Sequence, residues 1–300
     1  MKNKYVFLGD MNSINAEIIS KSYPVLKGKV KYILLGNIND FKRYLLRTKS
    51  KLKINEILNP LDFSEFNNQS INIFNIENNS SKKYKNLLNQ LTIANTLSNT
   101  TNYDLITMPI NKNVFKKYIK FIGLTEYLGE INRKKTLMLM CGEKFSITPF
   151  TTHINPKNIS KNLNKGALNN FLKNIQKMVI DKRYNLNFNY IKFLCYNPHC
   201  GESNTIGNED SKIQKVISKF KNIKGPYPAD SAFVNINKKT LFISTYHDQA
   251  LIPFKALNTK GINMTLGLDY RRISPAHGTA LDIKYKNISD NTSYIECMKI

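Results

Sequence analysis

The chain has 300 residues, of which 41% are hydrophobic, and 45 Lys and Arg against 21 Asp and Glu give a formal net charge of +24. This length and hydrophobic fraction exclude a disordered protein and fit one large or two medium domains. No apolar run approaches the roughly 18 residues that span a membrane, and the first apolar stretch is too short for a signal peptide. We therefore expect a cytoplasmic protein with reduced cysteines and no membrane contact.

The positive charge has two explanations. It would suit a nucleic-acid-binding protein, because phosphate backbones attract basic domains. It would also follow from the compositional bias of an AT-rich genome, since lysines are scattered over unrelated segments and form no tail or repeat. We favour compositional bias, and we expect no nucleic-acid partner.

Short apolar runs that end at glycine or polar residues predict strands, and helical spacing of apolar residues predicts helices. In chain order the predicted elements are strands at 4–8 and 29–35, a helix at 81–97, a strand at 103–107, a hairpin at 136–151, a long helix at 159–184, a strand at 190–196, a helix at 211–220, and strands at 241–245 and 262–266. The Asn-rich segment 67–81 is either a loop or an edge strand. This alternation predicts an α/β fold with a largely parallel sheet, whose functional loops follow the strand ends.

Three histidines follow apolar runs at comparable positions. His153, His199 and His247 are 46 and 48 residues apart, so they cannot form a local metal-binding knuckle. They meet only if successive βα units bring them to one edge of the sheet, where three imidazoles would leave coordination positions open for water or substrate. From the residues alone, this metal site and three unrelated loop histidines remain alternatives.

Six sequence blocks follow one another between residues 107 and 283. They are TMPINK (107–112), GLTEYL (123–128), NPHCGESNTIGNED (197–210), GPYPADSAF (225–233), YHDQALIPFK (246–255) and INMTLGLDYRRISPAHGTALDI (262–283). In sequence, order and rough spacing they resemble the blocks of the 4-hydroxythreonine-4-phosphate dehydrogenase (PdxA) family of vitamin B6 biosynthesis. Several long ungapped motifs in the same order are more specific than a single glycine pattern.

The resemblance implies an α/β fold of two domains, like that of the isocitrate and isopropylmalate dehydrogenases, with the active site in a cleft between the domains. Residues 1–122 and 275–300 would form the first domain, and 123–274 the second, which would carry the metal and substrate site. The family binds NAD without the G-x-G-x-x-G fingerprint, which this chain lacks. The resemblance also implies a homodimer whose partner subunit helps complete each site.

The implied reaction is the NAD-dependent oxidation of 4-phosphooxy-L-threonine to 2-amino-3-oxo-4-phosphooxybutanoate, which decarboxylates to 3-amino-2-oxopropyl phosphate. The implied metal ligands are His153, His199 and His247, which would hold Zn²⁺, Mg²⁺ or Co²⁺. The implied substrate ligands are Thr125, Lys255, Asn263 and Arg272. The implied NAD loop contains His277, Gly278, Thr279, Ala280 and Asp282. Candidates for proton transfer or for positioning other groups are Lys112, Asp230 and Asp248.

The chain also departs from the family pattern. Two glycines and two prolines of the usual N-terminal loop are replaced within 9–17, and Leu124 stands where the family has a histidine that contacts substrate. Ala276 replaces an aspartate before His277, and 284–287 reads KYKN instead of a glycine-rich run. Leu124 motivates an alternative function, a metal-dependent dehydrogenase of another phosphorylated hydroxy acid.

Overall fold

The computed structural model describes residues 3–300, which fold into two compact units. Unit 1 comprises the chain through Lys135 together with Leu268–Ile300, and unit 2 comprises Thr136–Gly267. The sequence placed these boundaries near residues 122 and 275. Segments 123–135 and 268–274 belong to unit 1, where Leu128, Leu268 and Tyr270 are fully buried in a hydrophobic cluster.

Unit 1 contains a parallel arrangement of six strands in the order β3-β4-β2-β1-β5-β12. The strands are β1 (Lys4–Phe7), β2 (Tyr32–Gly36), β3 (Ile54–Ile57), β4 (Ile71–Asn75), β5 (Asp104–Thr107) and β12 (Arg272–Pro275). Every residue of β1, β2, β5 and β12 is buried, as expected for parallel strands covered on both faces. This confirms the strands predicted near the N-terminus and at 103–107.

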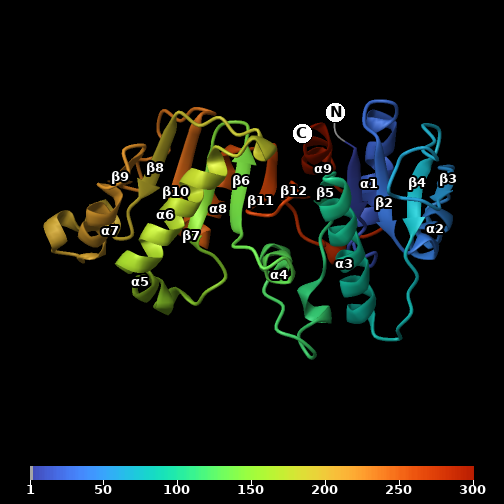
Figure 1. Ribbon diagram of the computed structural model, residues 1–300, viewed down its shortest axis with the longest axis horizontal. Helices are drawn as coiled ribbons and strands as arrows, with labels where there is room; N and C mark the ends of the chain where they lie inside the picture. The colour runs from blue at the N-terminus through green and yellow to red at the C-terminus, as the bar shows by residue number, and fades with distance from the viewer. Residues whose placement is uncertain (1–2) are drawn as a thin grey trace. The chain divides into compact units, whose positions relative to one another are not determined.

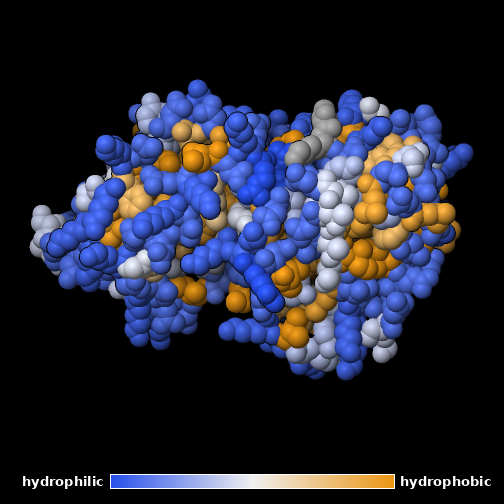
Figure 2. Space-filling view, in the orientation of Figure 1, coloured by the Kyte–Doolittle hydropathy of each residue, from blue (hydrophilic) through white to orange (hydrophobic). Residues whose placement is uncertain are grey.

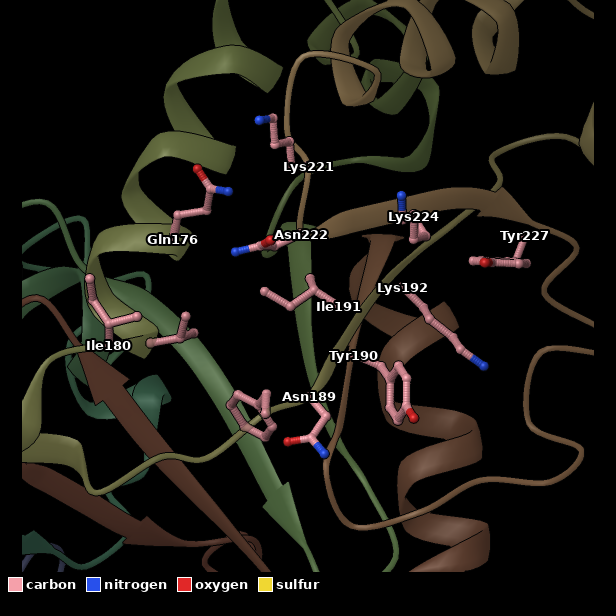
Figure 3. A pocket seen from close by; sticks show the side chains of 12 residues that line it. Gln176, Ile180, Asn189, Tyr190, Ile191, Lys192, Lys221, Asn222, Lys224 and Tyr227 are labelled. Carbon is pink, nitrogen blue, oxygen red and sulfur yellow. The ribbon is translucent and has the colours of Figure 1, made fainter.

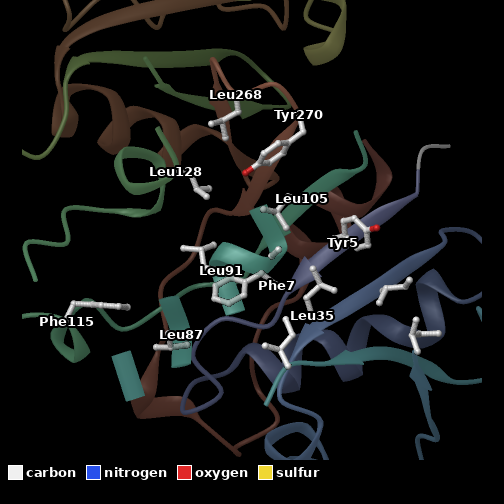
Figure 4. Packing of buried hydrophobic residues seen from close by; sticks show 14 residues of the cluster. Tyr5, Phe7, Leu35, Leu87, Leu91, Leu105, Phe115, Leu128, Leu268 and Tyr270 are labelled. Carbon is white, nitrogen blue, oxygen red and sulfur yellow. The ribbon is translucent and has the colours of Figure 1, made fainter. Parts of the chain in front are cut away.

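The helices of unit 1 cover these strands. They are α1 (Asn15–Leu26), α2 (Ile38–Arg47), α3 (Lys83–Thr101), α4 (Leu124–Ile131) and α9 (Thr292–Lys299). The helix α3 packs against β1, β2 and β5, and α9 packs against α1 and β12 (Figure 1). Figure 4 shows the resulting core, in which Phe7, Leu35 and Leu105 lie beside Leu87 and Leu91 of α3. Burial of such side chains contributes roughly 1.5–3 kcal/mol each.

The Asn-rich segment 67–81 is loop at both ends, and its middle, 71–75, forms β4. This strand is not at an edge, because it pairs with β3 on one side and β2 on the other. Its polar residue Asn72 is buried, and both polar atoms of its side chain form hydrogen bonds. The Asn72 Oδ1 accepts from Asn55 Nδ2 and from the Asn67 N–H, and its Nδ2 donates to the carbonyls of Asn67 and Ser70. These protein groups take the place of the water molecules that would otherwise bind the Asn72 amide, so the buried side chain leaves no polar atom unsatisfied.

Unit 2 contains six strands in the order β11-β6-β7-β10-β8-β9. They are β6 (Leu137–Gly142), β7 (Ser146–Thr151), β8 (Tyr190–Leu194), β9 (Ile223–Tyr227), β10 (Thr240–Tyr246) and β11 (Gly261–Leu266). The predicted hairpin is confirmed, since β6 and β7 are antiparallel neighbours. The strands β7, β10, β8 and β9 run parallel, whereas β6 is antiparallel to both of its neighbours.

The single long helix predicted over 159–184 is wrong. The helices of unit 2 are α5 (Ile159–Asn162), α6 (Lys165–Val179), α7 (Glu209–Ile217) and α8 (His247–Leu257). The break falls at Asn164, whose side chain accepts from the Ala167 N–H and so caps α6. An asparagine that caps a new helix stabilises it by about 1 kcal/mol, which favours two helices over a continuous one.

Figure 2 shows hydrophilic residues over most of the face in view, with hydrophobic patches between them. Within residues 3–300, no helix is both long enough and apolar enough to cross a membrane.

The buried ion cluster of unit 1 yields a stability prediction. Asp104 Oδ2 accepts from Lys4 Nζ at 3.0 Å and from Arg271 Nη2 at 2.5 Å, and burial lowers the pKa of Lys4 while Asp104 opposes that shift. Asp104→Asn removes the carboxylate that Lys4 and Arg271 share, and leaves Arg271 only its contact with the Ile300 oxygen, so we expect the free energy of unfolding in urea to fall by about 3–5 kcal/mol. The matched control is Asp269→Asn, which removes an exposed pair with Lys134 and should cost at most about 1 kcal/mol. Equal losses in the two variants would contradict this account.

Candidate active site

The loops after three adjacent parallel strands carry the three predicted metal ligands. Tyr246 of β10 is opposite Thr151 of β7, and β8 lies on the other side of β10. His153 follows β7 by two residues, His247 is the first residue of α8 directly after β10, and His199 lies in the turn after β8. Because parallel strands end at the same edge of a sheet, these loops share one edge of unit 2.

The structure brings two of these imidazoles together. The ring centroids of His153 and His247 are 5.5 Å apart. The Nδ1 atom of His247 lies 2.7 Å from Asp248 Oδ1, a contact that fixes the orientation of the ring. Across residues 3–300, no three His, Cys, Asp or Glu side chains lie close enough to form a metal site, so His199 does not join this pair within the single chain.

His199 begins an unusual backbone segment. The φ angle is positive at every residue from His199 to Asn204, with values between 43° and 80°. A left-handed conformation costs roughly 1–2 kcal/mol for each residue other than glycine. Strain of this kind persists only where the surrounding contacts determine the conformation, and it concentrates at functional sites.

Asp210 supplies the contacts that anchor this turn. Its side chain is buried, and its carboxylate accepts hydrogen bonds from the backbone N–H groups of Tyr196 and Asn197 at 2.7 and 2.9 Å. The same carboxylate accepts from Asn197 Nδ2, which also donates to Glu209. The first turn of α7 therefore holds the segment that leads into the His199 turn.

Two of the four predicted substrate ligands lie together in unit 1. The Arg272 guanidinium is buried, its Nε donates to Thr107 Oγ1 at 2.9 Å, and its Nη1 donates to Thr125 Oγ1 at 3.3 Å. Burial lowers the pKa of Arg272 to about 10, and this side chain therefore stays cationic at neutral pH. Lys112 is exposed in a short 3-10 helix after β5. Leu124, the residue that replaces the family histidine, packs against the hydrophobic cluster of unit 1.

The other two predicted substrate ligands belong to unit 2. Lys255 is exposed two turns along α8 from His247, and Asn263 lies on β11. The Asn263 Oδ1 atom is buried and has no hydrogen-bond partner, so the amide has an acceptor to offer a ligand. Asp230 is exposed in the loop between β9 and β10.

The predicted NAD loop lies in unit 1 and presents unused polar groups. The His277 Nε2 atom is buried and unpartnered, and Nδ1 lies 2.9 Å from the Gly278 carbonyl. A side chain built on Gly278 would meet no atom within 4 Å, whereas Asp282 is exposed. The Ile14 N–H donates to the carbonyl of Thr279, which links the loop to the start of α1.

The altered N-terminal loop is held by a residue that the sequence analysis did not single out. Asn15 is buried, and its Nδ2 donates to the carbonyls of Leu8, Asp10 and Pro109. Gly9 has a φ of +67°, and a side chain there would lie 2.5 Å from the Pro109 carbonyl. A buried amide therefore organises this loop, although two of its usual glycines and two prolines are missing.

A pocket of about 660 Å³ lies elsewhere in unit 2, between the end of α6 and the strands β8 and β9. Figure 3 shows Lys192, Lys221 and Lys224 around it, with Tyr190 and Ile191. None of the predicted site residues lines this pocket.

Two α/β units with polar loops at the ends of their parallel strands are typical of α/β enzymes. The family model described as "Pyridoxal phosphate biosynthetic protein PdxA" matches residues 20–300. The chain belongs to this family. The matched region starts beyond the altered loop 9–17.

Similar proteins carry one enzyme name. The 4-hydroxythreonine-4-phosphate dehydrogenase of Sulfurihydrogenibium sp. is 30% identical over 98% of this chain and 96% of its own. That of Hydrogenobaculum sp. is 39% identical, over 65% of this chain and 64% of its own. The crystal structure of 4-hydroxythreonine-4-phosphate dehydrogenase from Klebsiella pneumoniae has a TM-score of 0.84 at 24% identity and covers 100% of this chain and 98% of that one, which shows the same fold. The predicted α/β fold and the resemblance to this family are confirmed, and the family is one of dehydrogenases of pyridoxine biosynthesis.

The burial of His277 leads to a pH prediction. Burial lowers its pKa below the usual 6.5, so the imidazole in the folded protein is neutral at pH 7. The unfolded state binds the proton more tightly, and the stabilisation present above pH 6.5 is lost as the pH falls through the folded pKa. We expect the His277 ring signal, assigned by its absence in His277→Gln, to titrate below pH 6.5 in an NMR titration. A midpoint at or above 6.5 would contradict this.

Proposed function

We propose that the chain catalyses the NAD- and divalent-metal-dependent oxidation of 4-phosphooxy-L-threonine to 2-amino-3-oxo-4-phosphooxybutanoate, which loses carbon dioxide to give 3-amino-2-oxopropyl phosphate. The observation that carries this proposal is the placement of His153, His199 and His247 after adjacent parallel strands in a member of this family. The similarly named enzymes from Sulfurihydrogenibium and Hydrogenobaculum support the substrate.

The proposed substrate ligands match the chemistry of this molecule. The substrate carries a carboxylate, a phosphate and a vicinal amino alcohol, so it needs cationic and amide groups around it. Arg272 is cationic and already donates to Thr125, and Lys255 is an exposed ammonium group. Charge-assisted hydrogen bonds of this kind are about twice as strong as neutral ones. The unpartnered Asn263 Oδ1 would accept from the amino group or the hydroxyl of the substrate.

The imidazole pair fits a divalent metal ion in its donor chemistry. Neutral imidazoles suit Zn²⁺ or Co²⁺ better than Mg²⁺, which prefers oxygen ligands. His153 and His247 would supply two ligands, and His199 the third. When bound, such an ion lowers the pKa of a coordinated hydroxyl and polarises a carbonyl. Asp248 would hold the His247 ring through its contact at Nδ1, and Lys112 and Asp230 remain candidates for moving the hydroxyl proton.

The remaining parts of the proposal concern NAD and assembly. NAD would supply the hydride acceptor. The loop that would hold it contains His277, Gly278, Thr279, Ala280 and Asp282, with the free Nε2 of His277 as one polar contact. We propose a homodimer in which the partner subunit helps complete the site. The sequence resemblance supports this arrangement.

A second candidate function keeps the fold and the metal but changes the substrate. Leu124 fills an apolar position at the start of α4, where the family has a polar residue that contacts substrate. Loss of that contact would suit another phosphorylated hydroxy acid that lacks the amino group.

Steady-state kinetics separates these candidates. Purified protein with Zn²⁺ or Co²⁺ should reduce NAD with 4-phosphooxy-L-threonine, at a kcat/KM at least about tenfold above that for 4-phosphoerythronate or 4-phosphothreonate, because a site with groups for the amine rejects analogues that lack it. NADH absorbance measures the rate. Preference for a deaminated acid would favour the second candidate, and no NAD reduction with any of the three would overturn both.

A matched pair of lysine variants serves as a control in the same assay. Lys255→Met should raise KM for the phosphorylated substrate about tenfold or more, since it removes a charge-assisted contact. Lys221→Met changes an exposed lysine of the same unit outside the proposed site and should leave KM unchanged.

A further inference from the structure

A single glutamine side chain joins two of the histidine-bearing strand ends. Gln249 lies in the first turn of α8, two residues after His247. Its Nε2 donates to the Cys195 carbonyl at 2.8 Å, and its Oε1 accepts from the backbone N–H and the hydroxyl of Thr245 at 2.8 and 2.9 Å. One amide therefore spans from the end of β10 to the residue that follows β8.

This bridge lies beyond the paired part of the two strands. The register between β10 and β8 extends to Ile243 and Phe193. Beyond that pair, the amide of Gln249 links the Thr245 backbone to the Cys195 backbone. The amide thus takes over the role of the backbone ladder where the strands lead into their functional loops.

The hydrogen bonds continue on both sides of Gln249. On one side, Thr151 Oγ1 donates to the Thr245 carbonyl at 2.7 Å, which ties the end of β7 to β10. On the other, the Cys195 thiol donates to the Asn197 carbonyl, and Asp210 accepts from the Asn197 N–H. A continuous chain of contacts therefore reaches from the loop of His153, past His247, to the turn of His199.

We propose that Gln249 is a positioning residue that sets the relative placement of the three histidine-bearing loops. It need not touch substrate or metal, because its two hydrogen-bonding atoms hold the backbones from which the loops start. The functional consequence rests on the metal-dependent function proposed above. Residues that orient metal ligands in this way typically change metal affinity by about 10- to 100-fold when they are replaced.

Gln249→Glu tests this role with a minimal change of shape. The carboxylate keeps an oxygen for Thr245 but places a second oxygen against the Cys195 carbonyl, where two acceptors repel each other. The matched control is Gln214→Glu, the same substitution at an exposed position of α7. Two measurements apply: Co²⁺ binding followed by its visible absorption spectrum, and hydrogen–deuterium exchange of residues 196–204 in metal-free protein.

We expect Gln249→Glu to weaken Co²⁺ binding at least about tenfold and to alter the Co²⁺ spectrum, with faster exchange in 196–204 and an unchanged KM for NAD. Gln214→Glu should behave as wild type. Wild-type affinity, spectrum and exchange in Gln249→Glu would overturn the inference. If wild-type protein binds no Co²⁺, the metal part of the proposed function fails, and exchange alone then decides: faster exchange supports the role of Gln249, and unchanged exchange refutes it.

A second variant covers the case in which Gln249→Glu does not fold. Thr151→Val removes the hydroxyl donor to the Thr245 carbonyl while keeping the shape of the side chain. It should weaken Co²⁺ binding in the same direction, by a smaller factor. An unchanged Co²⁺ affinity and spectrum in this variant would count against the chain of contacts.

Discussion

Parallel pairing of β7, β10 and β8 is the constraint on which the candidate active site depends. It brings the loops of His153, His199 and His247 to one edge of unit 2 although they are far apart in sequence. A strand shifted by one residue would turn its side chains to the opposite face, so the buried residues of these strands also fix where each loop begins. The hydrophobic core of unit 2 thereby determines the positions from which the three histidine loops start.

Side-chain hydrogen bonds to the backbone position the loops that follow the strands. Gln249 binds the Cys195 carbonyl beyond the end of the β8–β10 register, and Asp210 binds the N–H groups of Tyr196 and Asn197 after β8 ends. Burying these polar side chains would destabilise the fold if their polar atoms had no hydrogen-bond partners, and the contacts with the backbone supply those partners. The left-handed turn from His199 to Asn204 is the strained part of this arrangement, and the Asp210 carboxylate holds Tyr196 and Asn197, which lead into it.

The sequence predicted the features that repeat along the chain and missed those that depend on distant partners. Apolar runs located β1, β5 and the β6–β7 hairpin, and the positions of the histidines after such runs indicated a shared sheet edge. The helix α8 was not predicted, because it starts directly after β10 without a side-chain cap and contains Pro253. The contact of Gln249 with Cys195 crosses 54 positions, so no local pattern indicates it. Likewise, the Asn-rich composition of 67–81 gave no sign of a buried strand, because Asn72 is buried through hydrogen bonds that include one to the distant Asn55.

The proposed reaction depends on binding of a divalent metal ion by the histidine loops at this edge. The most direct test is equilibrium dialysis of wild-type protein and of His153→Gln and His247→Gln variants against Zn²⁺, with bound metal measured by mass spectrometry. We expect wild type to retain Zn²⁺. Each variant should bind Zn²⁺ at least about tenfold more weakly and should no longer reduce NAD. Wild-type Zn²⁺ affinity in both variants would show that these histidines do not bind the metal.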